Sequence, residues 1–211
     1  MAKGKSALAL ALKKKIGSND EIQKVTHWID TGFPPLNKAI SGRYDGGFPC
    51  GRIVEVFGPP SAGKTFLATA AMISAQKQDG LAVFLDHENS FDVGLAVANG
   101  LNADEDDGQW VYKQPDTFED SVELIGTILK LVRDEELIPE SAPICIVADS
   151  LASMVPNSKA EKFEKMAEGT AKDKDQLNMN DNTALARAVT NGAIVIHTQR
   201  LKSDPGGNLL S

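Results

Sequence analysis

The chain has 211 residues, of which 42% are hydrophobic, 24% charged and 6% aromatic, a composition typical of globular proteins. Its apolar runs fall far short of the roughly 20 residues that cross a bilayer, which excludes a membrane-spanning helix protein. The net charge of −7 excludes a wholly basic nucleic-acid-binding module, although local basic segments can still bind a polyanion. Two cysteines far apart in the sequence argue against a disulfide scaffold and favour a reducing, cytoplasmic location.

Residues 1–27 are expected to form an N-terminal arm. The first 15 residues carry five lysines and no acid, and lysines stand where a signal peptide would have its cleavage site. Leu8 and Leu12 are four residues apart and share one face of a helix. A short helix is therefore predicted within Met1–Ile16.

From residue 52 onward, short apolar runs alternate with helical segments. Strands are predicted at Ile53–Phe57, Leu81–Leu85, Trp110–Tyr112, Pro143–Ala148 and Ala193–His197, and helices at Thr65–Gln78, Asp92–Asn99 and Phe118–Glu135. This alternation is typical of βαβ units, so we predict an α/β fold with a mostly parallel sheet and helices on both of its faces. The segment Pro156–Asn182 is rich in charged and polar residues and is predicted to be a mobile loop with one short helix.

One glycine-rich stretch matches the pattern GxxxxGK[ST] between a predicted strand and a predicted helix. It consists of Gly58, Pro59, Pro60, Ser61, Ala62, Gly63, Lys64 and Thr65, and Phe66 follows in the helix. In such a loop, successive backbone N–H groups and the helix N-terminus bind phosphate, the lysine reaches the terminal phosphates, and the hydroxyl binds Mg²⁺. The pattern therefore predicts a nucleotide-binding site. A glycine turn before a surface helix is the alternative.

Polar residues follow the predicted strands, at the edge of a parallel sheet where ligands bind. Asp149 directly follows the apolar run Ile144–Ala148. A carboxylate at the end of such a strand is typical of a residue that holds Mg²⁺ together with a loop hydroxyl, here that of Thr65. The alternative role of Asp149 is a helix N-cap.

Asp86 and Glu88 are equally placed, by spacing alone, to orient and deprotonate an attacking water. Gln199, at the end of the last predicted strand, is a candidate sensor of the terminal phosphate, with a polar residue at the sheet edge as its alternative.

Several of these stretches, taken together, resemble the RecA recombinases. The resemblance is carried by Gly46–Thr65, Phe84–Glu88, Gln114–Thr117, Asp149–Ser150 and Gly206–Asn208, which follow the order of that family. The overall pattern is similar to bacteriophage RecA-like recombinases. Circadian-clock and replicative-helicase ATPases share the core fold, but the Gly-Pro opening of the loop and the motif at Glu88 favour RecA.

The resemblance implies a RecA-like ATPase core over residues 28–211 and a role for each matching residue. Glu88 matches the catalytic glutamate of the family, which decides between it and Asp86. Lys64 and Gln199 match catalytic residues that contact or sense the γ-phosphate. Asp149 matches the carboxylate that holds Mg²⁺ together with a loop hydroxyl. Asp92 matches an acidic residue near the adenine of ATP.

The resemblance also implies an ATP-dependent DNA recombinase of homologous recombination and repair. Such a protein hydrolyses ATP and binds single-stranded DNA as a helical nucleoprotein filament, with no membrane partner. The segment after Pro156 is expected to be the first DNA-binding loop, and the N-terminal arm is expected to pack on a neighbouring subunit.

Three features depart from the family pattern. Leu95 stands where the family has an aromatic ring against adenine, and only Leu201–Pro205 lie where it has a long second DNA-binding loop. With the sequence stopping at Ser211, the C-terminal part of the core is expected to be incomplete. The alternative function is a shortened RecA-like nucleotide-binding protein that modulates a partner filament without strand exchange.

Overall fold

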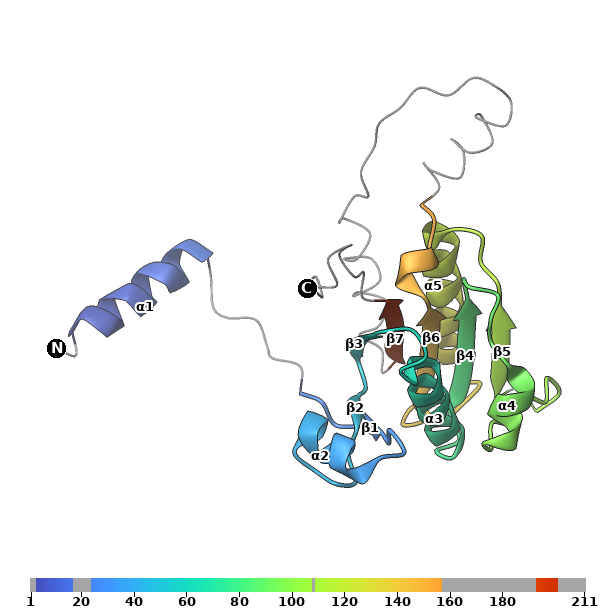
Figure 1. Ribbon diagram of the computed structural model, residues 1–211. Coiled ribbons are helices and arrows are strands. Elements are labelled where there is room, and N and C mark those ends of the chain that lie inside the picture. Colours follow the sequence, from blue (N-terminus) through green and yellow to red (C-terminus); the bar gives the residue numbers. More distant parts are fainter. Residues whose placement is uncertain (1–2, 17–23, 108, 157–192, 201–211) are drawn as a thin grey trace, which may run out of the picture.

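A five-stranded parallel sheet with helices packed against it forms the main body of the fold (Figure 1). The computed structural model describes residues 3–16, 24–107, 109–156 and 193–200, the last of these as backbone. The sheet and its helices are, in chain order, β3 (Arg52–Gly58), α3 (Lys64–Gln76), β4 (Leu81–Asp86), α4 (Val93–Ala98), β5 (Trp110–Lys113), α5 (Phe118–Asp134), β6 (Ile144–Asp149), the 3₁₀ turn η1 (Leu151–Ser153) and β7 (Ala193–Arg200).

The strands lie in the order β3-β7-β6-β4-β5, and each neighbouring pair is parallel. Parallel strands need crossover connections, and α3 and α5 provide them on the two faces of the sheet. The carboxyl ends of the strands therefore meet at one edge. In that register Asp86 lies beside Asp149, and Gln199 lies beside Phe57.

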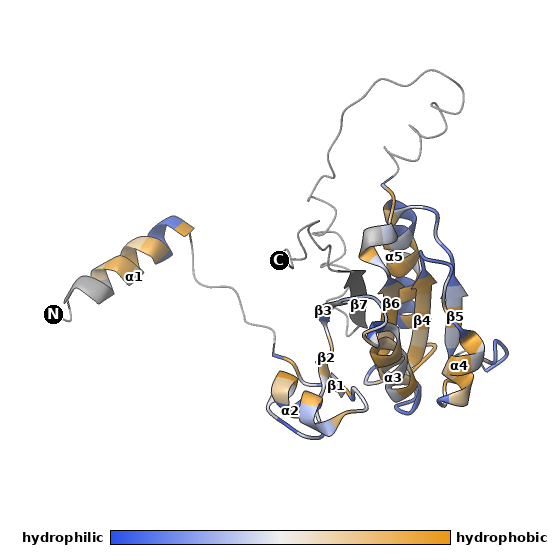
Figure 2. Cartoon of the chain, in the orientation of Figure 1, coloured by the Kyte–Doolittle hydropathy of each residue, from blue (hydrophilic) through white to orange (hydrophobic). Residues whose placement is uncertain are grey.

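The central strands β4 and β6 are buried along their whole length, because helices cover both faces of the sheet. Alternate residues of each strand belong to different cores, as the two-residue period of a strand requires. Ala82 and Phe84 of β4 pack in the core that contains α3, whereas Val83 and Leu85 pack in the core that contains α5. Figure 2 shows the hydrophobic residues concentrated on these strands.

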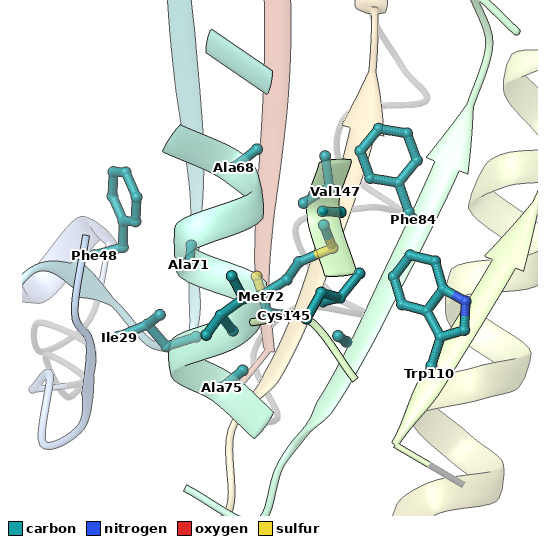
Figure 3. Close-up of a cluster of buried hydrophobic side chains, with 14 residues drawn as sticks. Ile29, Phe48, Ala68, Ala71, Met72, Ala75, Phe84, Trp110, Cys145 and Val147 are labelled. Atoms are coloured by element: carbon teal, nitrogen blue, oxygen red, sulfur yellow. The ribbon is translucent and has the colours of Figure 1, made fainter. Parts of the chain in front are cut away.

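The core on the α3 side combines aliphatic, aromatic and sulfur-containing side chains (Figure 3). Met72 is fully buried in it, with small alanines on either side along α3, which lets the helix lie close to the sheet. Neither cysteine forms a disulfide. Cys145 on β6 is buried in this core, and the partly buried Cys50 packs against the same core. Burial raises the pKa of the Cys50 thiol to about 11, so this cysteine is protonated at neutral pH.

A small unit precedes the main sheet. It contains β1 (Trp28–Ile29), α2 (Pro34–Ser41) and β2 (Phe48–Pro49), and β1 pairs antiparallel with β2. Asn37 of α2 is buried and bonds to the loop after β1: its Oδ1 accepts from the N–H of Thr31 at 3.0 Å, and its Nδ2 donates to Asp30 at 2.6 Å.

The N-terminal helix α1 spans Lys3–Ile16, in agreement with the predicted helix. Its described apolar side chains are exposed, with Leu8 at 63% and Leu10 at 68% of their accessible surface. Three lysines occupy its last turn, where positive charge is favourable for the helix dipole. In the described part of the chain, no helix combines the length and the apolar character that a bilayer crossing needs.

The predicted α/β fold with a parallel sheet is confirmed, and every predicted strand and helix from residue 52 to residue 156 is present. The sequence patterns did not predict helix α2 or the two short strands β1 and β2. Two prolines at the start of α2 and Gly42 at its end, with φ of 77°, are the usual signals of a helix start and stop. The predicted mobile loop within Pro156–Asn182 lies outside the described residues from 157 onward, as do Leu201–Pro205 and Gly206–Asn208.

Gly80, between α3 and β4, provides a test of how tightly the sheet is packed. A Cβ at this position would lie 2.1 Å from the carbonyl oxygen of Pro143 and 2.7 Å from that of Ala75. Because both atoms are backbone, Gly80→Ala should lower the free energy of unfolding by about 2 kcal/mol, as overpacking does in other cores. Gly126→Ala is the control: its Cβ meets no atom within 4 Å on helix α5, so it should stabilise by about 0.5–1 kcal/mol. Urea denaturation measures both, and equal effects would contradict the packing described.

Candidate functional site

The predicted phosphate loop lies between β3 and α3, at the carboxyl edge of the sheet. Gly63 adopts a left-handed conformation with φ of 85° and forms the N-cap of α3. Because its N-cap is a glycine, this 13-residue helix has no N-cap side chain to bond to the N–H groups of the first turn, which are directed toward the loop. A helix N-terminus of this kind attracts negative charge, and the loop therefore fits a phosphate group.

The ammonium group of Lys64 lies over this loop. Its Nζ donates to the carbonyl oxygens of Pro59 at 2.9 Å and Gly58 at 3.2 Å. The Lys64 ammonium group is thus held against the loop that leads from β3 to the N-terminus of α3. A phosphate placed there would offer charged acceptors in place of these neutral carbonyls, and hydrogen bonds to charged acceptors are the stronger ones.

Thr65 and Asp149 are in direct contact, although 84 residues separate them in the sequence. The Thr65 hydroxyl donates to Oδ2 of Asp149 at 2.7 Å. Burial raises the pKa of Asp149, and the nearby Glu88 and Asp86 raise it further, whereas the Thr65 hydrogen bond and Lys64 lower it. Negative charge is therefore crowded here, and a cation would relieve it.

The Thr65–Asp149 pair fits Mg²⁺, which prefers oxygen ligands and usually keeps water and phosphate oxygens among them. Within the described ranges, no group of three or more His, Cys, Asp or Glu side chains is placed to hold a metal by itself. The two protein oxygens would therefore need phosphate oxygens and water to complete an octahedral shell.

Asp86 and Glu88 have different surroundings. Asp86 is 2% exposed, and its two oxygens accept from the backbone N–H groups of Glu88, Ser90 and Phe91 at 3.1–3.3 Å. The Tyr112 hydroxyl donates to Oδ2 of Asp86 at 2.9 Å. This carboxylate therefore holds the turn after β4 and the edge strand β5 together.

The Glu88 side chain instead faces the turn after β6. Its Oε1 accepts from the hydroxyl of Ser150 at 2.6 Å and from that of Ser153 at 3.2 Å. From the sequence, Ser150 was identified only as part of the motif Asp149–Ser150, and no role was predicted for Ser153. Two serines three residues apart, directly after a strand that ends in a carboxylate, were the available signal, because a 3₁₀ turn places such residues above one another.

His87 connects this edge of the sheet to α5. Its backbone N–H donates to the carbonyl of Asp149 at 2.7 Å, and its Nε2 lies 2.8 Å from the buried hydroxyl of Ser121. Burial lowers the pKa of His87 despite the opposing effect of Asp86, so the ring is neutral at neutral pH. His87 is therefore a structural link between β4, β6 and α5.

The remaining predicted residues lie around the same edge. Asp92 forms the N-cap of α4, where its Oδ1 accepts from the N–H of Leu95 at 2.9 Å. Leu95 is 58% exposed, and Phe66, which is also exposed, lies 6.4 Å from the ring of Phe33. Gln199 is placed only by its backbone, beside Phe57 at the end of β7.

Comparisons with known proteins point to one family. A family model of the RecA N-terminal domain matches residues 6–200. Proteins named RecA are similar to this chain: that of Desulforapulum autotrophicum is 40% identical over 147 residues, covering 70% of this chain and 37% of the relative. The RecA protein of Treponema denticola is 39% identical over 145 residues, covering 69% and 31% respectively. That of Oceanobacillus iheyensis is 37% identical over 172 residues, covering 76% and 44%. The chain thus spans between 31% and 44% of the length of these relatives.

The surroundings of Asp86 predict that it maintains the fold. Asp86→Asn replaces one acceptor oxygen by an N–H₂ group that faces N–H and O–H donors, so the free energy of unfolding should fall by about 2 kcal/mol. Asp92→Asn is the matched control, because asparagine is as good an N-cap as aspartate, and it should change stability by less than about 0.5 kcal/mol. Both values come from urea denaturation followed by circular dichroism. A loss as large in Asp92→Asn as in Asp86→Asn would contradict this assignment.

Proposed function

The chain belongs to the RecA family, and we propose that it is an ATP-dependent DNA recombinase that hydrolyses ATP and binds single-stranded DNA as a nucleoprotein filament. The observation that carries the proposal is the contact between the Thr65 hydroxyl and Asp149 at 2.7 Å, beside an uncapped helix N-terminus and Lys64. This combination of groups suits a nucleoside triphosphate with a divalent cation.

ATP would be held through its phosphates by the residues from Gly58 to Phe66. Backbone N–H groups and Lys64 would bind the phosphate oxygens, and Thr65 and Asp149 would hold Mg²⁺. When bound, Mg²⁺ neutralises phosphate charge. Asp92, on the α4 N-cap, would lie on the adenine side.

Hydrolysis needs a base for the attacking water, and Glu88 is proposed for this role. Its carboxylate would take a proton from water while the water oxygen bonds to the γ-phosphorus and the bond to the ADP oxygen breaks. The rival Asp86 already accepts hydrogen bonds from three backbone N–H groups and a tyrosine, which supports Glu88 as the base. Gln199, at the end of β7, would respond to the γ-phosphate.

The polyanion partner is proposed to be single-stranded DNA, held mainly through its phosphates. The basic N-terminal helix and its exposed leucines support self-association into a helical filament, in which the arm of residues 1–27 packs on a neighbouring subunit. We also propose that the protein acts in the cytoplasm, in homologous recombination and repair, and that it is similar to the bacteriophage members of the family.

ATP turnover tests the catalytic assignments. Lys64→Ala should lower ATP binding and abolish hydrolysis, because it removes the cation over the phosphate loop. Glu88→Gln should leave binding within about twofold and lower kcat by about 10²–10⁴-fold, the usual contribution of a general base. Steady-state phosphate release and titration with a fluorescent ATP analogue separate the two effects. Unchanged turnover in Glu88→Gln would reject its role as the base.

DNA dependence tests the recombinase assignment. Single-stranded DNA should raise kcat, and its affinity should fall linearly with salt on a log–log plot, because binding to phosphates releases counterions. Fluorescence anisotropy with a labelled oligonucleotide measures the affinity. Hydrolysis without any response to DNA would reject the DNA-dependent part of the proposal. Nucleotide binding with negligible turnover, together with a changed filament length of another recombinase, would favour the modulating role instead.

A further inference from the structure

Glu88 is held by two hydroxyl groups from a single turn. Ser150 Oγ lies 2.6 Å and Ser153 Oγ 3.2 Å from the same oxygen, Oε1 of Glu88, and the two hydroxyl oxygens lie 3.1 Å apart. Ser150 is buried and Ser153 half-buried. The three side chains thus form a closed triangle of polar contacts between the end of β4 and the turn η1.

The turn that supplies these hydroxyls is not part of the sheet. The ladder between β6 and β7 ends at Asp149, one residue before Ser150. Inside η1, the N–H of Ser153 donates to the carbonyl of Ser150 at 3.0 Å, and beyond it the carbonyl of Val155 accepts from Phe118 of α5 at 3.0 Å. The turn is therefore held outside the sheet, by these local bonds and by Met154, which packs against the core on the α5 side, whereas Asp149 is paired within the sheet.

We infer that Ser150 and Ser153 form a restraint that keeps Glu88 from acting as a base until η1 shifts. The inference rests on the proposed role of Glu88. A general base accepts the proton of water through a carboxylate oxygen, and Oε1 already accepts two hydrogen bonds. Hydrogen bonds also fix the orientation of the carboxylate toward η1. Single-stranded DNA, the partner in the proposed function, is the trigger to be tested.

Removal of the Ser153 hydroxyl tests the restraint. In Ser153→Ala, kcat without DNA should rise by about 3–10-fold, the factor expected for loss of one hydrogen bond of ordinary net strength, because the contact is long at 3.2 Å. KM for ATP should not change, because the phosphate loop is intact, and kcat with saturating DNA should stay within about twofold of wild type because the restraint is then already released. Ser153→Thr keeps the hydroxyl and should retain the wild-type ratio of the two rates.

Ser141→Ala is the matched control, since this serine is exposed in the loop before β6 and far along the sheet from Glu88. It should leave both rates unchanged. A second readout needs no nucleotide: thermal unfolding of wild type, Ser153→Ala, Glu88→Ala and the double variant. If the hydroxyl contacts Glu88, the shifts in Tm should be non-additive by about 2 °C or more.

The outcomes separate this inference from the proposed function. A DNA-stimulated wild type in which Ser153→Ala leaves the DNA-free rate unchanged, or lowers it, overturns the restraint while the proposed function stands. A wild type that does not respond to DNA, or does not turn over ATP, contradicts the proposed function. In that case the restraint still stands if Ser153→Ala hydrolyses ATP faster than wild type. It is overturned if the ATP hydrolysis rate of Ser153→Ala does not exceed that of wild type.

Discussion

The burial of β4 and β6 on both faces is the constraint on which the candidate site depends. Each strand places alternate side chains in two separate cores, one with α3 and one with α5. Sliding either strand by one residue would exchange the two sets of side chains, so the register is strongly fixed. That register is what brings Asp86 at the end of β4 beside Asp149 at the end of β6.

This alignment brings three carboxylates together at one edge of the sheet, and each of them accepts hydrogen bonds from a different set of donors. Backbone N–H groups and a tyrosine hydroxyl surround Asp86, serine hydroxyls contact Glu88, and the Thr65 hydroxyl contacts Asp149. Burial is the main cause of the raised pKa of Asp149, and the nearby Glu88 and Asp86 add to it. The charged form of Asp149 would therefore gain from a nearby cation.

The sequence was sufficient for the sheet and for the strand and helix on either side of Gly58–Thr65, because these depend on local patterns such as apolar runs of strand length. The phosphate-binding role of that loop, which its glycines, lysine and threonine at fixed spacing indicate, stays a prediction. The sequence was insufficient for α2 and the pair β1–β2. Two-residue strands are too short to show an alternating pattern, and the stop signal at Gly42 was the main local clue to the helix. The different surroundings of Asp86 and Glu88 depend on Tyr112 and Ser153, which are distant in sequence, so spacing could not reveal them.

The two halves of the site are anchored to different parts of the fold. Thr65 lies in the first turn of α3 and Asp149 ends a fully buried strand, so the pair proposed to hold the cation is anchored to the sheet and to the helix that follows β3. Glu88 lies beyond β4 and contacts Ser150 and Ser153 at η1. After η1, Met154 packs against the core on the α5 side, and Val155 accepts a hydrogen bond from Phe118, the first residue of α5. A displacement of η1 would therefore reorient the proposed base while leaving the proposed metal-binding pair in place. Because the groups proposed for nucleotide binding and for hydrolysis are anchored to different parts of the fold, we expect substitutions to change the affinity and the hydrolysis rate independently.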